Sequence, residues 1–122
     1  MPAIHRIVIY TKKLDQMVDF YTRHFGFEPL RLEGDRIVEL VSTDGGANLM
    51  LHPASKGTKV GQVLVKLVFD VPDVVAFKTQ CAENGFEFGP VHQADGYSYA
   101  NAKDPSKNSI QISSRAFRNE NS

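Results

Sequence analysis

The sequence predicts an α+β protein made of two tandem βαβββ modules, and two observations support this. Each half of the 122-residue chain reads as a strand, a helix and then three short strands. The landmarks of the two halves are also separated by a nearly constant distance: Gly26 and Gly85, each followed by Phe-Glu, are 59 residues apart, Asp44 and Asp104 are 60 apart, and Leu49 and Ile110 are 61 apart. A constant offset through helix end, turn and strand indicates that one unit was duplicated.

The first half begins with a β-rich run at residues 5–11, HRIVIYT. Apolar residues then recur at steps of three and four, which predicts an amphipathic helix: Leu14, Met17, Val18, Tyr21 and Phe25. Gly26 is expected to end this helix. Strands are predicted at 27–34, 36–43 and 47–52, separated by Gly-Asp and Asp-Gly-Gly turns.

The second half repeats this order. A strand is predicted at 62–70, and Val74, Phe77 and Cys81 form the apolar stripe of a helix with Pro72 in its opening turn. Strands follow at 86–91, 97–102 and 109–114. We therefore expect a single domain over 1–122, with module one at 1–54, a linker at 55–61, module two at 62–114 and a frayed polar tail at 115–122.

Charge and cysteine content exclude several classes of protein. Fourteen Lys and Arg balance fourteen Asp and Glu, so the chain lacks the basic character that nucleic-acid binding requires, and nothing in its charge favours a membrane surface. It has no apolar run long enough to cross a bilayer, and its N-terminus lacks the order of a signal peptide. With Cys81 as the only cysteine, a disulfide within the chain is impossible, and the cytoplasm is the simplest compartment. Cys81 is expected to be a small buried side chain.

Two motifs and the paired modules resemble the vicinal oxygen chelate superfamily, which includes glyoxalase I, extradiol dioxygenases and the fosfomycin- and bleomycin-resistance proteins. The motifs are VDFYTRHFGFEP at 18–29 and DPSKNSIQI at 104–112. The resemblance covers about residues 3–114. It implies that each module curls its sheet into a half-barrel, that two modules enclose a cavity, and that chains of this length commonly form homodimers. It also implies that metal ligands, where present, come from the first and last strands of each module.

Carried onto this chain, the four family positions are His5, Met50, Lys66 and Gln111. Lys66 brings a charged ammonium without a lone pair, Met50 a soft thioether and Gln111 a weak oxygen donor. We therefore expect no cofactor, and a divalent metal is disfavoured. A different metal site made by His5, His52 and Gln111 is the alternative, because His52 lies on the same strand face as Met50.

Strand alternation around these positions predicts the wall of the cavity. Ser109, Gln111 and Ser113 are expected to face it, while Ile110 and Ile112 pack under a helix. The remaining predicted wall residues come from three other strands: Ile7 and Ile9 beside His5, Leu64 and Val68 beside Lys66, and Asn48 and His52 beside Met50. Val8 and Leu49 are placed with the core. Aliphatic walls with a few polar groups suit a small organic ligand.

Lys66, Tyr97 and Tyr99 are the other candidates for ligand contacts. Lys66 interrupts an otherwise apolar strand, so its ammonium is expected to meet an anionic ligand, Gln111 or the solvent of a groove. Tyr97 and Tyr99 alternate on one strand, and they either stack on a flat ligand or are ordinary edge-strand aromatics. Glu39 and two arginines, Arg31 and Arg36, are charged residues that either reach the cavity or lie on the surface.

The leading functional prediction is a cavity protein that binds a small organic molecule without a metal, as the bleomycin-resistance proteins do. The alternative is an enzyme of the same superfamily, a lactoylglutathione-lyase-like lyase or isomerase or a dioxygenase-type enzyme. A metal-free enzyme would use His5 as general base and Lys66 as electrostatic stabiliser. A module that serves only interaction or regulation is a third interpretation.

Overall fold

The computed structural model describes residues 3–59 and 64–118, which belong to two compact units with a boundary between Val60 and Gly61. Each unit corresponds to one predicted module and is described by itself. Within the described residues, no helix is both long enough and apolar enough to cross a membrane.

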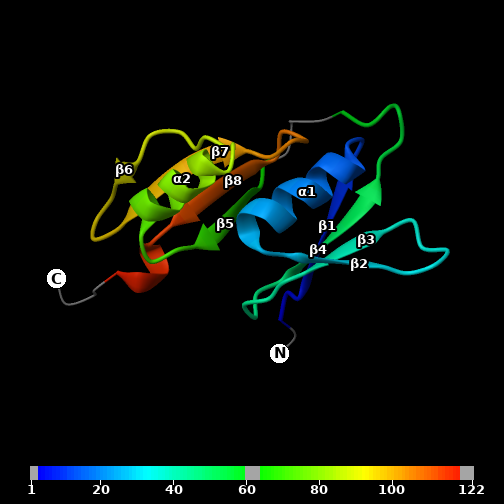
Figure 1. The fold of residues 1–122 in the computed structure, drawn as a ribbon, viewed down its shortest axis with the longest axis horizontal. Coiled ribbons are helices and arrows are strands. Elements are labelled where there is room, and N and C mark those ends of the chain that lie inside the picture. Colours follow the sequence, from blue (N-terminus) through cyan, green and yellow to red (C-terminus); the bar gives the residue numbers. More distant parts are fainter. Residues whose placement is uncertain (1–2, 60–63, 119–122) are drawn as a thin grey trace. The chain divides into compact units, whose positions relative to one another are not determined.

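The first unit is a four-stranded mixed sheet covered on one face by a helix (Figure 1). Its elements are β1 (Arg6–Thr11), α1 (Leu14–Phe25), β2 (Glu28–Arg31), β3 (Val38–Val41) and β4 (Asn48–Pro53). The strand order is β1-β4-β3-β2; β1 and β4 are parallel and the other pairs antiparallel. The predicted strand–helix–three-strand order is confirmed.

Helix α1 buries the stripe that the sequence predicts. Met17 and Tyr21 are fully buried, and Val18 is nearly so. Gly26 ends the helix in the left-handed conformation (φ 70°), and its amide donates to the Tyr21 carbonyl. Glycine adopts this conformation without the strain that a Cβ would bring, which is why the helix stops there.

The second unit repeats the architecture. Its elements are β5 (Lys66–Asp70), α2 (Val74–Glu83), β6 (His92–Gln93), β7 (Ser98–Lys103) and β8 (Ser109–Ser113), followed by a 3₁₀ helix (Arg115–Phe117). The strand order β5-β8-β7-β6 matches that of the first unit, again with its first and last strands parallel. Among the described residues, neither sheet closes into a barrel.

The two registers show how closely the modules correspond. Arg6 pairs with Asn48 in the first sheet, and Lys66 pairs with Ser109 in the second. The last strands therefore keep the offset of 61 residues that the sequence indicates, whereas the first strands are offset by 60.

The strand predicted at 86–91 is wrong, because β6 forms only at His92–Gln93. Gly89 and Pro90 lie in the middle of the predicted run, and proline has no amide hydrogen to give to a sheet. The amide of Gly89 instead donates to the Asn101 carbonyl at 2.8 Å, and its own carbonyl accepts from the Lys78 ammonium at 2.9 Å. Phe88 is buried beside this contact, so the segment packs on the unit without forming a strand.

The DPSKN motif forms a turn organised by a buried carboxylate. The Asp104 side chain accepts from the amide of Ser106 and from the amide and side chain of Asn108, each at 2.9 Å. Asp104 is only 4% exposed, so these bonds replace the water that its carboxylate loses. The motif that supports the family resemblance therefore has a structural role here.

The expectation of a frayed tail is wrong for its first part, since residues 115–117 form the 3₁₀ helix. This short helix is connected back to the sheet: the amide of Ser98 donates to the Ser114 hydroxyl, and the amide of Arg115 donates to the Ser113 hydroxyl. Residues 119–122 and positions 60–61 of the predicted linker lie outside the described residues.

Candidate functional site

The open face of each sheet, the face turned away from its helix, carries the candidate residues. In the first sheet the face under α1 holds the buried Leu49 and Leu51. Register places Ile7 beside Leu49 and Ile9 beside Leu51, so these isoleucines belong to the core. The prediction that they line the cavity, with Val8 in the core, is wrong. Arg6, Val8 and Tyr10 are the β1 residues that share the open face with Asn48, Met50 and His52.

His5 and His52 lie at opposite ends of this sheet. His5 is exposed and precedes β1, and its carbonyl accepts from the Asn48 amide at 2.7 Å. His52 pairs with Tyr10, and the two ring centroids are 5.0 Å apart. Its Nδ1 lies 2.8 Å from the Pro53 carbonyl oxygen. Five residue steps along the strands separate the two histidines, about 16 Å. The structure therefore does not bring them together as one metal site.

Polar side chains on the open face of the first sheet form a closed cluster. Glu39 Oε2 accepts from Arg6 Nε at 3.2 Å and from Asn48 Nδ2 at 2.8 Å. The glutamate side chain is 20% exposed and the arginine 59% exposed. Charge is thus balanced within the cluster. Two other candidates, Arg31 and Arg36, are exposed.

The open face of the second sheet agrees with the prediction. Lys66, Val68, Gln111 and Ser113 share it by register, while Ile110 and Ile112 are fully buried on the other face. Lys66 Nζ donates to Asn101 Oδ1 at 3.1 Å, and Gln111 Nε2 donates to the same oxygen at 2.8 Å. The contact expected between Lys66 and Gln111 therefore passes through Asn101, a residue that the sequence did not single out. Leu64, also predicted to line the cavity, is fully exposed.

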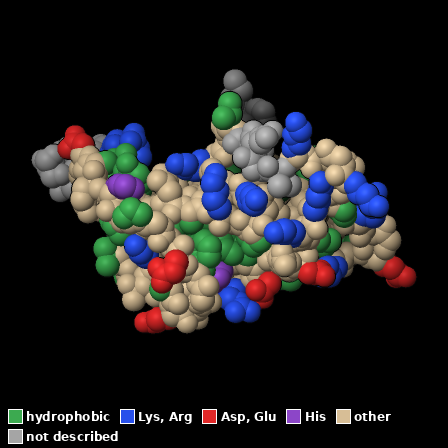
Figure 2. All heavy atoms as spheres, turned by 90° about the horizontal axis from the view of Figure 1, so that it is seen from above, with side chains coloured by type: hydrophobic (Ala, Val, Ile, Leu, Met, Phe, Trp, Pro, Cys, Tyr) green, Lys and Arg blue, Asp and Glu red, His purple; other side chains and the backbone are tan. Residues whose placement is uncertain are grey.

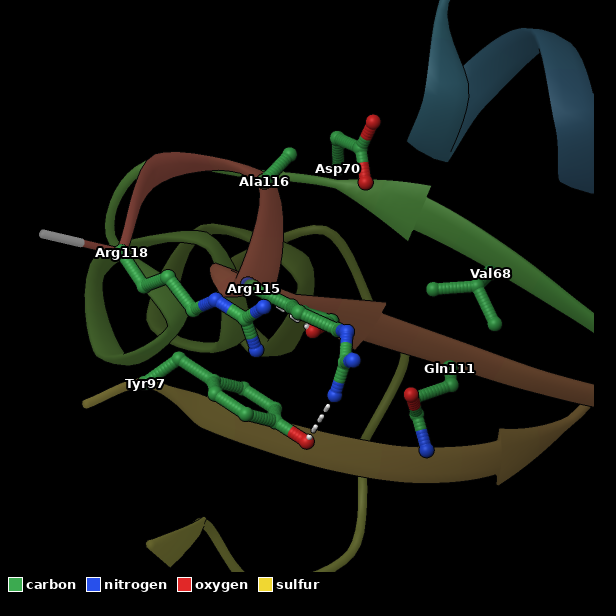
Figure 3. A pocket seen from close by; sticks show the side chains of 8 residues that line it. Val68, Asp70, Tyr97, Gln111, Arg115, Ala116 and Arg118 are labelled. Atoms are coloured by element: carbon green, nitrogen blue, oxygen red, sulfur yellow. Dashed lines mark hydrogen bonds between the residues drawn. The ribbon is translucent and has the colours of Figure 1, made fainter. Parts of the chain in front are cut away.

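A hollow of about 470 Å³ opens on the second unit (Figure 3). It is lined by residues of β5 and β8, the turn before β7 and the 3₁₀ helix: Val68, Asp70, Tyr97, Gln111, Ser113, Arg115, Ala116 and Arg118. Tyr97 and Gln111 were predicted as ligand contacts, and Val68 and Ser113 as wall. The arginines were missed, because a polar C-terminal segment reads as tail. The weak sequence signal for the arginines was the Ser113-Ser114 pair that precedes them. The two serine hydroxyls accept hydrogen bonds from the amides of Arg115 and Ser98, which connect the 3₁₀ helix to the sheet.

An aromatic row extends from this hollow along the edge of the sheet. Tyr97 and Tyr99 have ring centroids 6.3 Å apart, and Tyr99 lies 5.2 Å from the ring of His92. Arg115 donates from Nη1 to the Tyr97 hydroxyl at 3.1 Å, and its Cζ lies 5.4 Å from the centroid of that ring. Tyr97 thus lines the hollow, and Tyr99 supports it from the side.

The donor set does not fit a metal ion. The sequence predicts His5 for the first-strand position of module one, but register makes Arg6 the counterpart of Lys66, so the first- and last-strand positions of the two modules become Arg6, Met50, Lys66 and Gln111. Two of these are cations without a lone pair, one is a thioether and one a neutral amide. Across residues 3–59 and 64–118, no three His, Cys, Asp or Glu side chains are grouped so that they could hold a metal.

Cys81 offers no alternative chemistry. The residue is 2% exposed on the core side of α2, as predicted. Burial raises the pKa of its thiol, which keeps it protonated and poorly nucleophilic.

The fold is therefore that of a protein built from two tandem βαβββ modules, each with one sheet face that its helix leaves open. The chain belongs to the Glyoxalase/Bleomycin resistance protein/Dioxygenase superfamily, whose family model matches residues 3–112. No curated protein sequence gives a significant match.

Solved structures share the fold at low identity. TnmS3, an antibiotic binding protein from Streptomyces sp. CB03234, has a TM-score of 0.76 and 18% identity, over 92% of this chain and 94% of its own. A lactoylglutathione lyase from Agrobacterium tumefaciens has a TM-score of 0.72 and 22% identity, over 94% and 95%. TioX from Micromonospora sp. ML1 has a TM-score of 0.71 and 18% identity, over 92% and 98%.

Proposed function

We propose that the chain binds a small organic molecule on the open face of its second module and that binding needs no metal ion. The observation that carries this proposal is the hollow of about 470 Å³ with its convergent polar groups. Its volume falls within the range of ligand pockets, about 300–1,000 Å³. Val68 and the Tyr97 ring supply apolar wall, and Gln111, Ser113 and the arginines supply directional hydrogen bonds.

Binding is favoured over catalysis by the donor set. A superfamily enzyme of the lyase, isomerase or dioxygenase kind would need metal ligands at the strand positions, where this chain has Arg6, Met50, Lys66 and Gln111. The metal-free alternative would use His5 as general base and Lys66 as electrostatic stabiliser, and the Lys66 ammonium already donates to Asn101 Oδ1. A fold shared with both an antibiotic binding protein and a lactoylglutathione lyase is compatible with either function.

The test starts from untagged protein treated with EDTA. A thermal-shift screen of neutral, anionic, aromatic and aliphatic small molecules is followed by calorimetry on each compound that raises Tm. We expect at least one organic ligand to bind the metal-free protein, with an unchanged dissociation constant when divalent ions are added. A screen without any such ligand would contradict the proposal.

Metal content gives an independent result. After exposure to Mg, Mn, Fe, Ni and Zn and passage through gel filtration, elemental analysis should find well below one equivalent of each ion. One equivalent retained by the wild type and lost in His5→Ala would contradict metal-free binding and favour the enzyme.

We also propose that the chain forms a homodimer. Apolar side chains on the open faces reach solvent, with Val8 47% exposed, Tyr10 60% exposed and Val68 53% exposed. Figure 2 shows hydrophobic side chains at the surface between the charged ones. Covering such side chains with a second copy would remove them from water. Light scattering at micromolar concentration should give twice the chain mass; a mass of 13.6 kDa would contradict a dimer.

A further inference from the structure

We infer that the hollow of the second module is built for an aromatic organic anion, with Arg115 and Arg118 as the residues that bind its anionic group. The inference rests on the proposed function and deepens it, since it names a ligand class for that site. It also moves the anion-binding role away from Lys66, the residue that the sequence indicated.

The charge of the hollow carries the first step. Two guanidinium groups and one carboxylate, that of Asp70, line it. In the described part of the chain, neither arginine forms an ion pair with Asp70. Two cations in one small hollow repel each other, and an anion between them would offset this repulsion. The guanidinium fork binds carboxylates through two parallel hydrogen bonds, which makes an organic carboxylate a suitable ligand.

The orientation of the arginines carries the second step. Figure 3 shows the side chains of Arg115 and Arg118 both extending from the 3₁₀ helix over the hollow, on the side of Tyr97. Arg115 is held by its hydrogen bond to the Tyr97 hydroxyl at 3.1 Å, so part of its conformational freedom is already lost before a ligand arrives. One of its donors is engaged there, and a guanidinium has five in all.

The walls of the hollow carry the third step. The Tyr97 ring lies beside the cationic groups, and the exposed Val68 side chain lies across the hollow from them in Figure 3. An aromatic ring with a carboxylate at one end fits this pattern, since its ring meets tyrosine and valine while its anionic end meets the arginines. A simple inorganic anion would leave these apolar walls unused.

Lys66 is less suited to this role. Its ammonium donates to Asn101 Oδ1, and the residue is exposed and does not line the hollow. The Lys66–Asn101–Gln111 cluster instead holds the Gln111 amide at the edge of the hollow.

The test uses calorimetry on the full, EDTA-treated chain with three probes. Naphthoate carries both features of the inferred ligand, naphthamide keeps the ring without the charge, and cyclohexanecarboxylate keeps the charge without the aromatic ring. Since hydrogen bonds to charged groups contribute most, naphthoate should bind about 10-fold or more tightly than naphthamide. Cyclohexanecarboxylate should bind more weakly than naphthoate.

Variants then assign the effect to the arginines. Arg118→Gln should weaken naphthoate binding by about 10-fold or more and naphthamide binding by less than about 3-fold. Arg115→Gln should act in the same direction. The matched control is Arg36→Gln, an exposed arginine of the first unit, which should leave both dissociation constants unchanged. Thermal unfolding of each variant serves as the check on folding.

Equal binding of naphthamide and naphthoate would overturn the inference while leaving the proposed function in place. Naphthoate binding unchanged in both folded arginine variants would overturn it as well. Absence of binding by both naphthalene probes at millimolar concentration would also overturn it, and the neutral and aliphatic compounds of the wider screen would then decide the proposed function separately.

Discussion

The two modules share a backbone plan but differ on their open faces. In each module a cationic side chain on the first strand donates a hydrogen bond to a side-chain oxygen on the third strand. The same oxygen also accepts a hydrogen bond from a side-chain amide on the fourth strand. In the first module the acceptor is the Glu39 carboxylate, which balances the charge of Arg6. In the second it is the neutral Asn101, and among the described residues no carboxylate forms an ion pair with Lys66. The second module also adds the arginines of the 3₁₀ helix.

This difference shows where the duplicated unit tolerates change. The core faces and the strand pairings correspond in the two modules. A shift of register by one residue would move the apolar side chains of a strand from the core to the solvent. Side chains on the open faces are free of that constraint. Ligand-binding chemistry is therefore expected in the module whose open face carries cations that its own acidic groups do not neutralise.

The largest expected effect on the free energy of unfolding comes from a substitution in the Asp104 turn, compared with the corresponding turn of the first module. Asp104→Ala removes the hydrogen bonds that the buried carboxylate accepts from Ser106 and Asn108, and we expect it to lower the free energy of unfolding by about 2–4 kcal/mol. The matched change Asp44→Ala affects an exposed residue in the corresponding turn, where the Ser42 hydroxyl accepts the turn amides instead. It should cost less than about 0.5 kcal/mol. Urea unfolding followed by circular dichroism measures both; similar losses would show that the turns are equivalent.

Changing the charge of the two acceptors, Glu39 and Asn101, tests whether charge distinguishes the open-face clusters of the two modules. Glu39→Gln should lower the free energy of unfolding by about 0.2–1 kcal/mol, because it removes an exposed ion pair. Asn101→Asp should raise it by a similar amount at low salt by giving Lys66 a carboxylate. Unfolding at low and high salt checks the cause, since added salt should weaken the contribution of each ion pair. A gain from Asn101→Asp that persists in high salt would contradict the electrostatic explanation.

The last comparison concerns backbone conformation in the two turns. Lys107 has a φ of 67°, whereas Gly45 takes the left-handed conformation in the first turn with a φ of 83°. Lys107→Gly should raise the free energy of unfolding by about 0.5 kcal/mol, and Gly45→Ala should lower it by about 1 kcal/mol. Thermal unfolding in matched buffers measures both. Destabilisation by Lys107→Gly would indicate that the stabilising contacts of the lysine side chain exceed the cost of its left-handed backbone conformation.

Much of the fold could be predicted from the sequence because local signals agreed with the tertiary structure. The periodic stripe of α1 and the glycine at its end depend on neighbouring residues, and the constant offset between the halves follows from duplication of one unit. The prediction of a strand at 86–91 was wrong because this apolar run contains Gly89 and Pro90. Phe88 in the same run is buried because it packs on the unit, without pairing in the sheet.

The site was less predictable, for two physical reasons. Ile7, Val8 and Ile9 are all apolar, so no alternation shows which of them faces the helix; pairing with β4 decides it. Arg115 and Arg118 follow the last strand, and tertiary hydrogen bonds of Ser113, Ser114 and Arg115 place this segment beside the sheet. In the second module, where polar and apolar residues of β8 alternate, the predicted face was confirmed.

Amide NMR of the metal-free chain, titrated with naphthoate in EDTA, tests the central claim most directly. Metal-free binding on the open face of the second module predicts shift changes concentrated in β5, β8, Tyr97 and residues 115–118, with β1 and β4 little affected. Changes centred on Glu39 and Asn48 in the first module, or binding that appears only after a divalent ion is added, would contradict the account.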